Sequence, residues 1–76
     1  MGGVDETLRT WGTNIRQVRK ALGFTQERLA DLVGVKHPTV CRWEKGQIEP
    51  RRQHKAAIAK ALHVDMNLLF PQMRAE

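Results

Sequence analysis

Apolar residues recur at three- and four-residue steps along most of this chain, which is the spacing of one face of an α-helix. The first such stripe predicts an amphipathic helix over residues 7–22 and consists of Leu8, Trp11, Ile15, Val18 and Leu22. Gly12 is expected to weaken the middle of this helix by up to about 1 kcal/mol relative to Ala. Gly23 is expected to end it, and Asp5 or Thr7 to cap it. Residues 1–6 are expected to be frayed.

Two shorter stripes follow between Thr25 and Gly46 and predict helices over residues 26–33 and 37–45. Their apolar positions are Leu29, Val33, Val35, Val40 and Trp43. Gly34 lies between them, where the chain must reverse and a positive φ is expected. Ala30 falls where the two helices would cross, and a larger side chain there would push them apart. Two helices joined at a steep angle by a short glycine-containing turn form a helix-turn-helix.

The remaining pattern predicts a fourth helix over 52–62, buried through Ile58, Ala59 and Leu62, and a one-turn helix over 66–70. Asp65 is placed to cap the last helix and Pro71 to stop it, which leaves 72–76 as a tail. No alternating pattern indicates a β-sheet. With 76 residues, the chain is expected to form one all-α domain, a compact bundle of about five short helices over residues 7–71.

Four motifs, taken in order, identify a family. They are WGTNIRQVRKALGFTQ, LADLVGV, VCRWEKG and, after a proline, AIAKALHV with a final LLF. From about Trp11 to Phe70 they resemble the Xre/Cro-CI family of phage-repressor-type helix-turn-helix domains. The resemblance implies a lambda-repressor-like fold and a repressor-like transcriptional regulator that binds double-stranded DNA sequence-specifically. It also implies that Gln26 binds backbone phosphate and that Arg19 and Glu44 form a structural ion pair.

The chain departs from the family's pattern at two helix starts. Lys36 occupies a cap position where the family usually has Ser or Thr, and Pro38 in the first turn is expected to compensate in part. Arg52 and Lys55 occupy positions that are often apolar in relatives. We therefore expect the fourth helix either to begin later or to expose its first turn.

The net charge of +5 and the isoelectric point near 10.2 indicate a polyanionic partner, although a solvated basic surface would give the same totals. The distribution of the charge is more informative. The excess lies between residues 35 and 55, where Glu44 and Glu49 are outnumbered by Lys36, Arg42, Lys45, Arg51, Arg52 and Lys55. This is the predicted second helix of the motif and the segment after it.

In a helix-turn-helix, the first residues of the second helix and the outward positions one turn later face the base edges. Here these residues are Lys36, His37, Pro38, Cys41 and Arg42. Arg42 can donate two parallel hydrogen bonds to guanine, or it can contact a phosphate or a surface acid instead. His37 can donate to an acceptor in the groove, whereas Pro38 and Cys41 can offer only apolar contact.

Phosphate contacts fix the register without reading sequence. The candidates are Gln26, Arg16, Lys45, Arg51 and Arg52. Arg51 and Arg52 could instead reach a minor groove.

Other chemistry finds little support. Cys41 is the single cysteine, so no intramolecular disulfide is possible, and a reducing, cytoplasmic setting without a membrane partner is expected. His37 and Cys41 have the spacing of a metal pair, but no third ligand is near in sequence, so neither a metal nor another cofactor is predicted. No nucleophile–base or carboxylate pair has a motif around it, and no enzyme is predicted.

Two rivals to DNA reading remain at this point. The same fold could serve as a protein-interaction module, in an antitoxin or adaptor, or it could bind RNA, although a helix cannot enter the narrow major groove of A-form RNA. An exposed apolar cluster of Leu68 with Met66 and Phe70 would favour a homodimer through the C-terminal helix region. Alternatively, Leu68 completes a small core.

Overall fold

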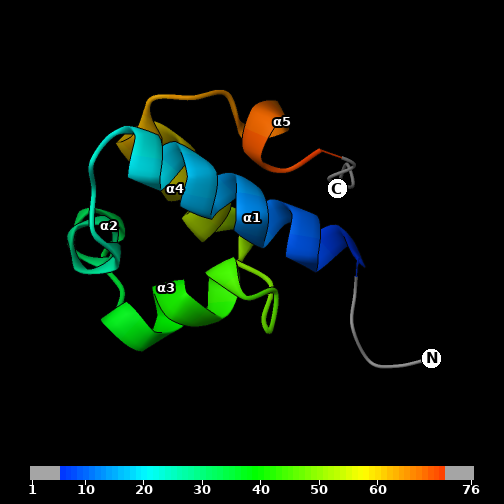
Figure 1. Ribbon diagram of the computed structural model, residues 1–76, viewed down its shortest axis with the longest axis horizontal. Helices are drawn as coiled ribbons and strands as arrows, with labels where there is room; N and C mark the ends of the chain where they lie inside the picture. Colours follow the sequence, from blue (N-terminus) through cyan, green and yellow to red (C-terminus); the bar gives the residue numbers. More distant parts are fainter. Residues whose placement is uncertain (1–5, 72–76) are drawn as a thin grey trace.

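The computed structural model describes residues 6–71, and within them the chain forms five α-helices and no strand (Figure 1). The helices are α1 (Glu6–Ala21), α2 (Gln26–Val33), α3 (His37–Glu44), α4 (Arg52–Leu62) and α5 (Met66–Leu69). The prediction of an all-α bundle is confirmed. Residue 6, which was expected to be frayed, already belongs to α1, and Thr7 lies inside the helix instead of capping it. Residues 1–5, including Asp5, and the predicted tail 72–76 lie outside the described residues.

The helices enclose one core, with α1 running through the middle of the bundle (Figure 1). α3 packs against α1 and α2, α2 also packs against α4, and α5 packs against α1 and α4. The buried apolar residues come from every helix: Trp11, Ile15, Leu29, Ala30, Val40, Trp43, Ile58, Ala59, Leu62, Leu69 and the adjoining Phe70. The almost complete burial of Ala30 agrees with a close crossing of α2 with its neighbours.

Leu22 does not extend the buried stripe of α1, because the helix ends before it. Leu22 is 45% exposed. Gly23 adopts φ 77° and donates its N–H to Lys20 O, while the N–H of Phe24 donates to Arg19 O at 3.0 Å. These two bonds end α1 in a left-handed turn, and Phe24 packs against the core in place of Leu22.

Lys55 corrects the expectation for the start of α4. The helix begins at Arg52 and Arg52 is exposed, but Lys55 is buried to 7% exposure. Its ammonium group donates to Glu49 Oε2 at 3.0 Å and lies 4.3 Å from the centre of the Trp11 ring. The aliphatic stem therefore fills an apolar position while the charge is satisfied by a carboxylate and an aromatic face.

The C-terminal end of the bundle also differs from expectation. Phe70 is fully buried and meets Trp11 edge to face, with ring centroids 5.4 Å apart. Leu68 is 69% exposed, so it neither completes the core nor forms an exposed cluster with Phe70. Trp11 also donates its indole N–H to Pro71 O at 2.8 Å, which ties the first helix to the end of the described chain.

Candidate nucleic-acid interface

The turn between α2 and α3 sets the direction of α3. Gly34 adopts φ 88°, and the N–H groups of Gly34 and Val35 both donate to Ala30 O, at 2.8 and 3.0 Å. α2 begins with Thr25, whose hydroxyl accepts from the Arg28 N–H. α3 begins without a side-chain cap at Lys36, and Pro38 lies in its first turn. The start of α3 is thus positioned by the glycine turn and by packing.

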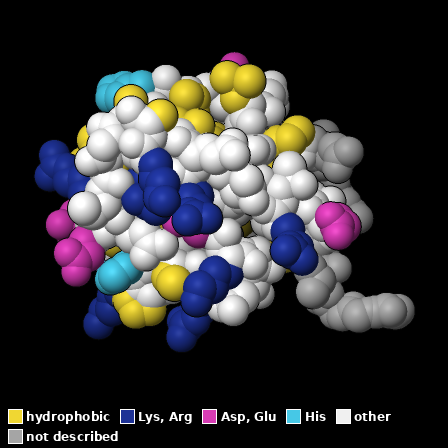
Figure 2. All heavy atoms as spheres, viewed as in Figure 1, with side chains coloured by type: hydrophobic (Ala, Val, Ile, Leu, Met, Phe, Trp, Pro, Cys, Tyr) yellow, Lys and Arg dark blue, Asp and Glu magenta, His cyan; other side chains and the backbone are white. Residues whose placement is uncertain are grey.

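The inner side of α3 is held by the core, because Val40 and Trp43 are buried. The residues predicted to face DNA bases are on its other side. Lys36, His37, Pro38 and Arg42 are exposed, and the thiol-bearing Cys41 is half-buried. In Figure 2, Lys and Arg side chains extend over the centre and the lower part of the face shown, and Figure 1 places α3 in the lower part. This arrangement offers an exposed helix with a basic surface.

The residues predicted to contact phosphate fall into two groups. Arg16, Lys45, Arg51 and Arg52 are exposed. Gln26 is half-buried, and both ends of its side-chain amide are already hydrogen-bonded within the protein.

An ion pair between α1 and α3 lies behind this surface. Arg19 donates through Nε to Glu44 Oε2 at 2.6 Å and through Nη2 to Glu44 Oε1 at 3.0 Å. Its Nη1 donates to Phe24 O at 2.7 Å, so the guanidinium also holds the turn after α1. The two side chains are only 8% and 4% exposed. The structural pair implied by the family resemblance is therefore present, in a two-pronged geometry.

Gln26 connects this pair to the exposed end of α3. Its Nε2 donates to Glu44 Oε1 at 2.9 Å, and its Oε1 lies 2.8 Å from His37 Nε2. This hydrogen-bonded link was not among the contacts predicted from the sequence. The positions of the two residues gave only a partial signal, because Gln26 and His37 are the first residues of α2 and α3.

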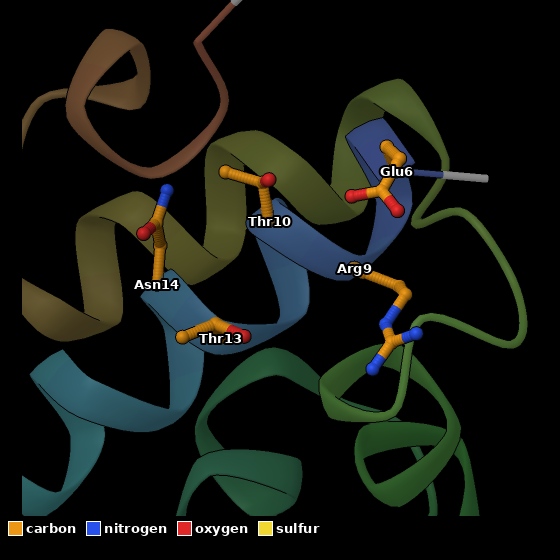
Figure 3. Close-up of a pocket in the computed structure, with 5 residues that line it drawn as sticks. All are labelled: Glu6, Arg9, Thr10, Thr13 and Asn14. Atoms are coloured by element: carbon orange, nitrogen blue, oxygen red, sulfur yellow. The ribbon is translucent and has the colours of Figure 1, made fainter. Parts of the chain in front are cut away.

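A hollow of about 440 Å³ is lined by Glu6, Arg9, Thr10, Thr13 and Asn14, all from α1 (Figure 3). None of these five residues belongs to the predicted DNA-contacting set. Within residues 6–71 there is no group of three or more His, Cys, Asp or Glu side chains placed to hold a metal ion. No helix in the same part of the chain is long and apolar enough to cross a membrane.

The fold and this surface define a helix-turn-helix domain of the DNA-binding class: α2 packs across α3, and α3 presents its N-terminal and outer positions to solvent. The comparisons with known proteins agree. The family model described as "Helix-turn-helix" (HTH_3) matches residues 15–69. The chain belongs to this helix-turn-helix family, and its relatives and structural neighbours include repressors of the Cro/CI type.

Two relatives illustrate the match in sequence. An HTH-type transcriptional regulator of Methanothermobacter thermautotrophicus is 48% identical over 50 residues, which is 66% of this chain and 72% of that protein. Repressor protein C2 of Salmonella phage P22 is 34% identical over 59 residues, which is 78% of this chain but only 27% of the repressor. The chain thus corresponds to a small part of the longer of these two relatives.

Solved structures match over most of the chain. The P22 c2 repressor in complex with a synthetic operator superposes with a TM-score of 0.78 at 32% identity, covering 83% of this chain and 96% of that one. The restriction-modification controller protein C.AhdI of Aeromonas hydrophila gives a TM-score of 0.79 at 33% identity, with the same two coverages.

Proposed function

We propose that this chain binds double-stranded DNA sequence-specifically as a repressor-like transcriptional regulator, with α3 in the major groove. Occupancy of an operator would then block or position RNA polymerase. The observation that carries the proposal is the exposed basic side of α3, whose inner side is fixed by the core and by the buried pair of Arg19 and Glu44. The operator complex of the P22 c2 repressor, a structural neighbour, supports it.

In this proposal, base edges are contacted from one side of α3 and phosphates from its surroundings. The base-contacting residues are Lys36, His37, Pro38, Cys41 and Arg42. The phosphate-contacting residues are Gln26, Arg16, Lys45, Arg51 and Arg52. Gln26 uses one amide hydrogen on Glu44, so its second amide hydrogen is the one left for a phosphate oxygen.

Arg42 provides the test of sequence reading. Arg42→Lys keeps the charge but removes the planar fork that recognises guanine O6 and N7 together. We expect most of the non-specific affinity to be retained and discrimination at one G·C pair to fall by about 1–3 kcal/mol. The measurement is a binding series over all four base pairs at each position of a selected duplex, at fixed salt.

Lys45→Ala is the matched control, because a phosphate contact carries no sequence information. It should weaken binding to all duplexes alike and reduce the salt dependence by about one unit of slope. If Arg42→Lys also weakens binding to all duplexes alike, Arg42 is a phosphate contact. Unchanged binding of both variants would instead favour a protein-interaction module.

We also propose that the chain acts as a homodimer through its C-terminal helix region. Leu68, on α5, exposes 69% of its surface, which makes it the most exposed large apolar residue within residues 6–71. A two-fold dimer would place two copies of α3 about 34–36 Å apart and require a nearly palindromic site.

Leu68→Glu should then abolish the dimer and weaken operator binding while leaving folding intact. Sedimentation at micromolar concentration, with and without DNA, decides: a wild-type monomer in both states contradicts the proposal.

A further inference from the structure

Four side chains form a continuous hydrogen-bonded series from the interior to the exposed start of α3. Arg19 contacts Glu44, Glu44 contacts Gln26, and Gln26 contacts His37. The series starts among buried groups and ends at an exposed one: the side chains of Arg19 and Glu44 are buried, whereas the side chain of His37 is 47% exposed. The series ends on a residue proposed to face the bases.

The chemistry of the groups determines the direction of every bond in the series. A guanidinium can only donate and a carboxylate can only accept, so Glu44 Oε1 accepts from both Arg19 and Gln26. Gln26 must therefore direct its NH₂ toward Glu44 and its carbonyl oxygen toward His37. The reverse orientation of the amide would bring two oxygens without a proton within 2.9 Å of each other. Because an amide oxygen can only accept, His37 Nε2 must carry the proton that joins them.

We infer that this series fixes the tautomer of His37 and thereby the kind of base atom it reads. With its proton on Nε2, a neutral imidazole has only Nδ1 left, and Nδ1 is an acceptor. In the major groove the donors are the amino groups at adenine N6 and cytosine N4. His37 is therefore assigned to an amino group, not to guanine O6 or N7 or thymine O4. This assignment rests on the proposed DNA-reading function.

In this inference His37 accepts a hydrogen bond from the base. The sequence had suggested the opposite direction, with His37 as the donor. Gln26 acts as a positioning residue. It is not proposed to contact a base itself, but it determines which nitrogen of His37 is available for a hydrogen bond to the base. A carboxylate lies close to the second nitrogen: Oε2 of Glu27, on α2, is 3.8 Å from Nδ1. Protonation of Nδ1 would turn it into a donor toward Glu27, so the assigned reading requires the neutral ring.

The tautomer can be measured in the free protein without DNA, by two-bond ¹H–¹⁵N correlation of the histidine rings at pH 8.5. The exposed His63 serves as an internal reference, and His37→Asn assigns the signals. We expect His37 to be a single Nε2–H tautomer and Gln26→Ala to move it toward the tautomer mixture of His63. Gln53→Ala, which removes an exposed glutamine from α4, should change nothing. A wild-type His37 that matches His63, carries its proton on Nδ1 or remains doubly protonated overturns the inference, whether or not the Gln26 variant folds.

The reading role is tested on a duplex selected from a random pool, at the base pair where His37→Ala loses its preference. Replacing the base there by an analogue without its amino group should weaken wild-type binding about three- to tenfold, the range of one hydrogen bond, and should not affect His37→Ala. A 7-deazapurine, which lacks the N7 acceptor, should have no effect. Sensitivity to the 7-deazapurine alone, or no base pair affected by His37→Ala, overturns the reading role. Binding to no duplex at all overturns the proposed function itself, whereas the tautomer is decided in the free protein.

Discussion

Glu44→Ala is expected to lower the free energy of unfolding by about 3–5 kcal/mol, because it leaves a buried guanidinium without its counter-charge. Arg19 loses two of its three hydrogen bonds in this variant and keeps only the one to Phe24 O. Gln26 loses its acceptor in the same step. Since a small domain is stable by about 5–15 kcal/mol, a loss of this size is a large part of the total. Chemical denaturation followed by circular dichroism measures it.

A double-mutant cycle separates the interaction from the burial of each residue. Arg19→Met should be destabilising for the converse reason, since it leaves a buried carboxylate. Arg19→Met combined with Glu44→Ala should be less destabilising than the sum of the two single changes, because neither charge is then left alone. Arg16→Met is the matched control: the residue is an exposed arginine of the same helix, and its loss should change stability by less than about 0.5 kcal/mol. Additive effects in the cycle would mean that Arg19 and Glu44 do not stabilise each other.

Glu44→Ala should also affect DNA binding, and the loss of stability alone does not explain this effect. Arg19 joins α1 to the last residue of α3, and Gln26 joins that residue to the first turn of α3. The Glu44 carboxylate is thus connected to both ends of α3, the proposed reading helix: Glu44 is its last residue, and Gln26 links the carboxylate to His37 in its first turn. An isolated surface ion pair would contribute little, but this one is buried and shared by three helices.

The fold could be predicted from the sequence because each helix is indicated by residues within it or next to it. Apolar spacing indicated the helical segments, and Gly34 and Asp65 occupy a turn and a cap whose chemistry is readable from neighbouring residues alone. The outward side of α3 followed by elimination, since Val40 and Trp43 had to face the core. Leu22 shows the limit of this reasoning, because the position of a helix end within its last turn depends on the turn that follows.

The sequence indicated which side of α3 is turned to solvent, but not the hydrogen bonds and ion pairs that connect its residues to the rest of the fold. For Lys55 the sequence predicted either a later start of the fourth helix or an exposed first turn. Only the three-dimensional arrangement brings Glu49 and the Trp11 ring to its ammonium group. The bond from Gln26 to His37 likewise joins residues 11 positions apart through a turn of specific geometry. Hydrogen-bond direction, on which the tautomer depends, is a property of the whole series and not of any one residue.

Gly12→Ala is expected to destabilise the protein by about 1–3 kcal/mol, although alanine is the better helix former. The reason is the close approach of α1 to the end of α3. A Cβ atom on residue 12 would lie 2.5 Å from the carbonyl oxygens of both Trp43 and Glu44. These are backbone atoms, so relief requires a movement of one helix relative to the other, not a change of rotamer. The free-energy cost of overpacking should therefore exceed the gain of about 1 kcal/mol from the higher helix propensity of alanine.

Thr13→Ala tests helix propensity at the next residue without the contact. Thr13 is exposed on α1, so its replacement should be neutral or stabilising by a few tenths of a kcal/mol. Gly12→Ala should also weaken operator binding beyond its effect on folding, because the helices separate where Glu44 must reach Arg19. Both effects can be measured on the same samples, by thermal unfolding and by titration with the selected duplex well below the unfolding temperature. A Gly12→Ala protein at least as stable as wild type would show that α1 and α3 do not approach this closely.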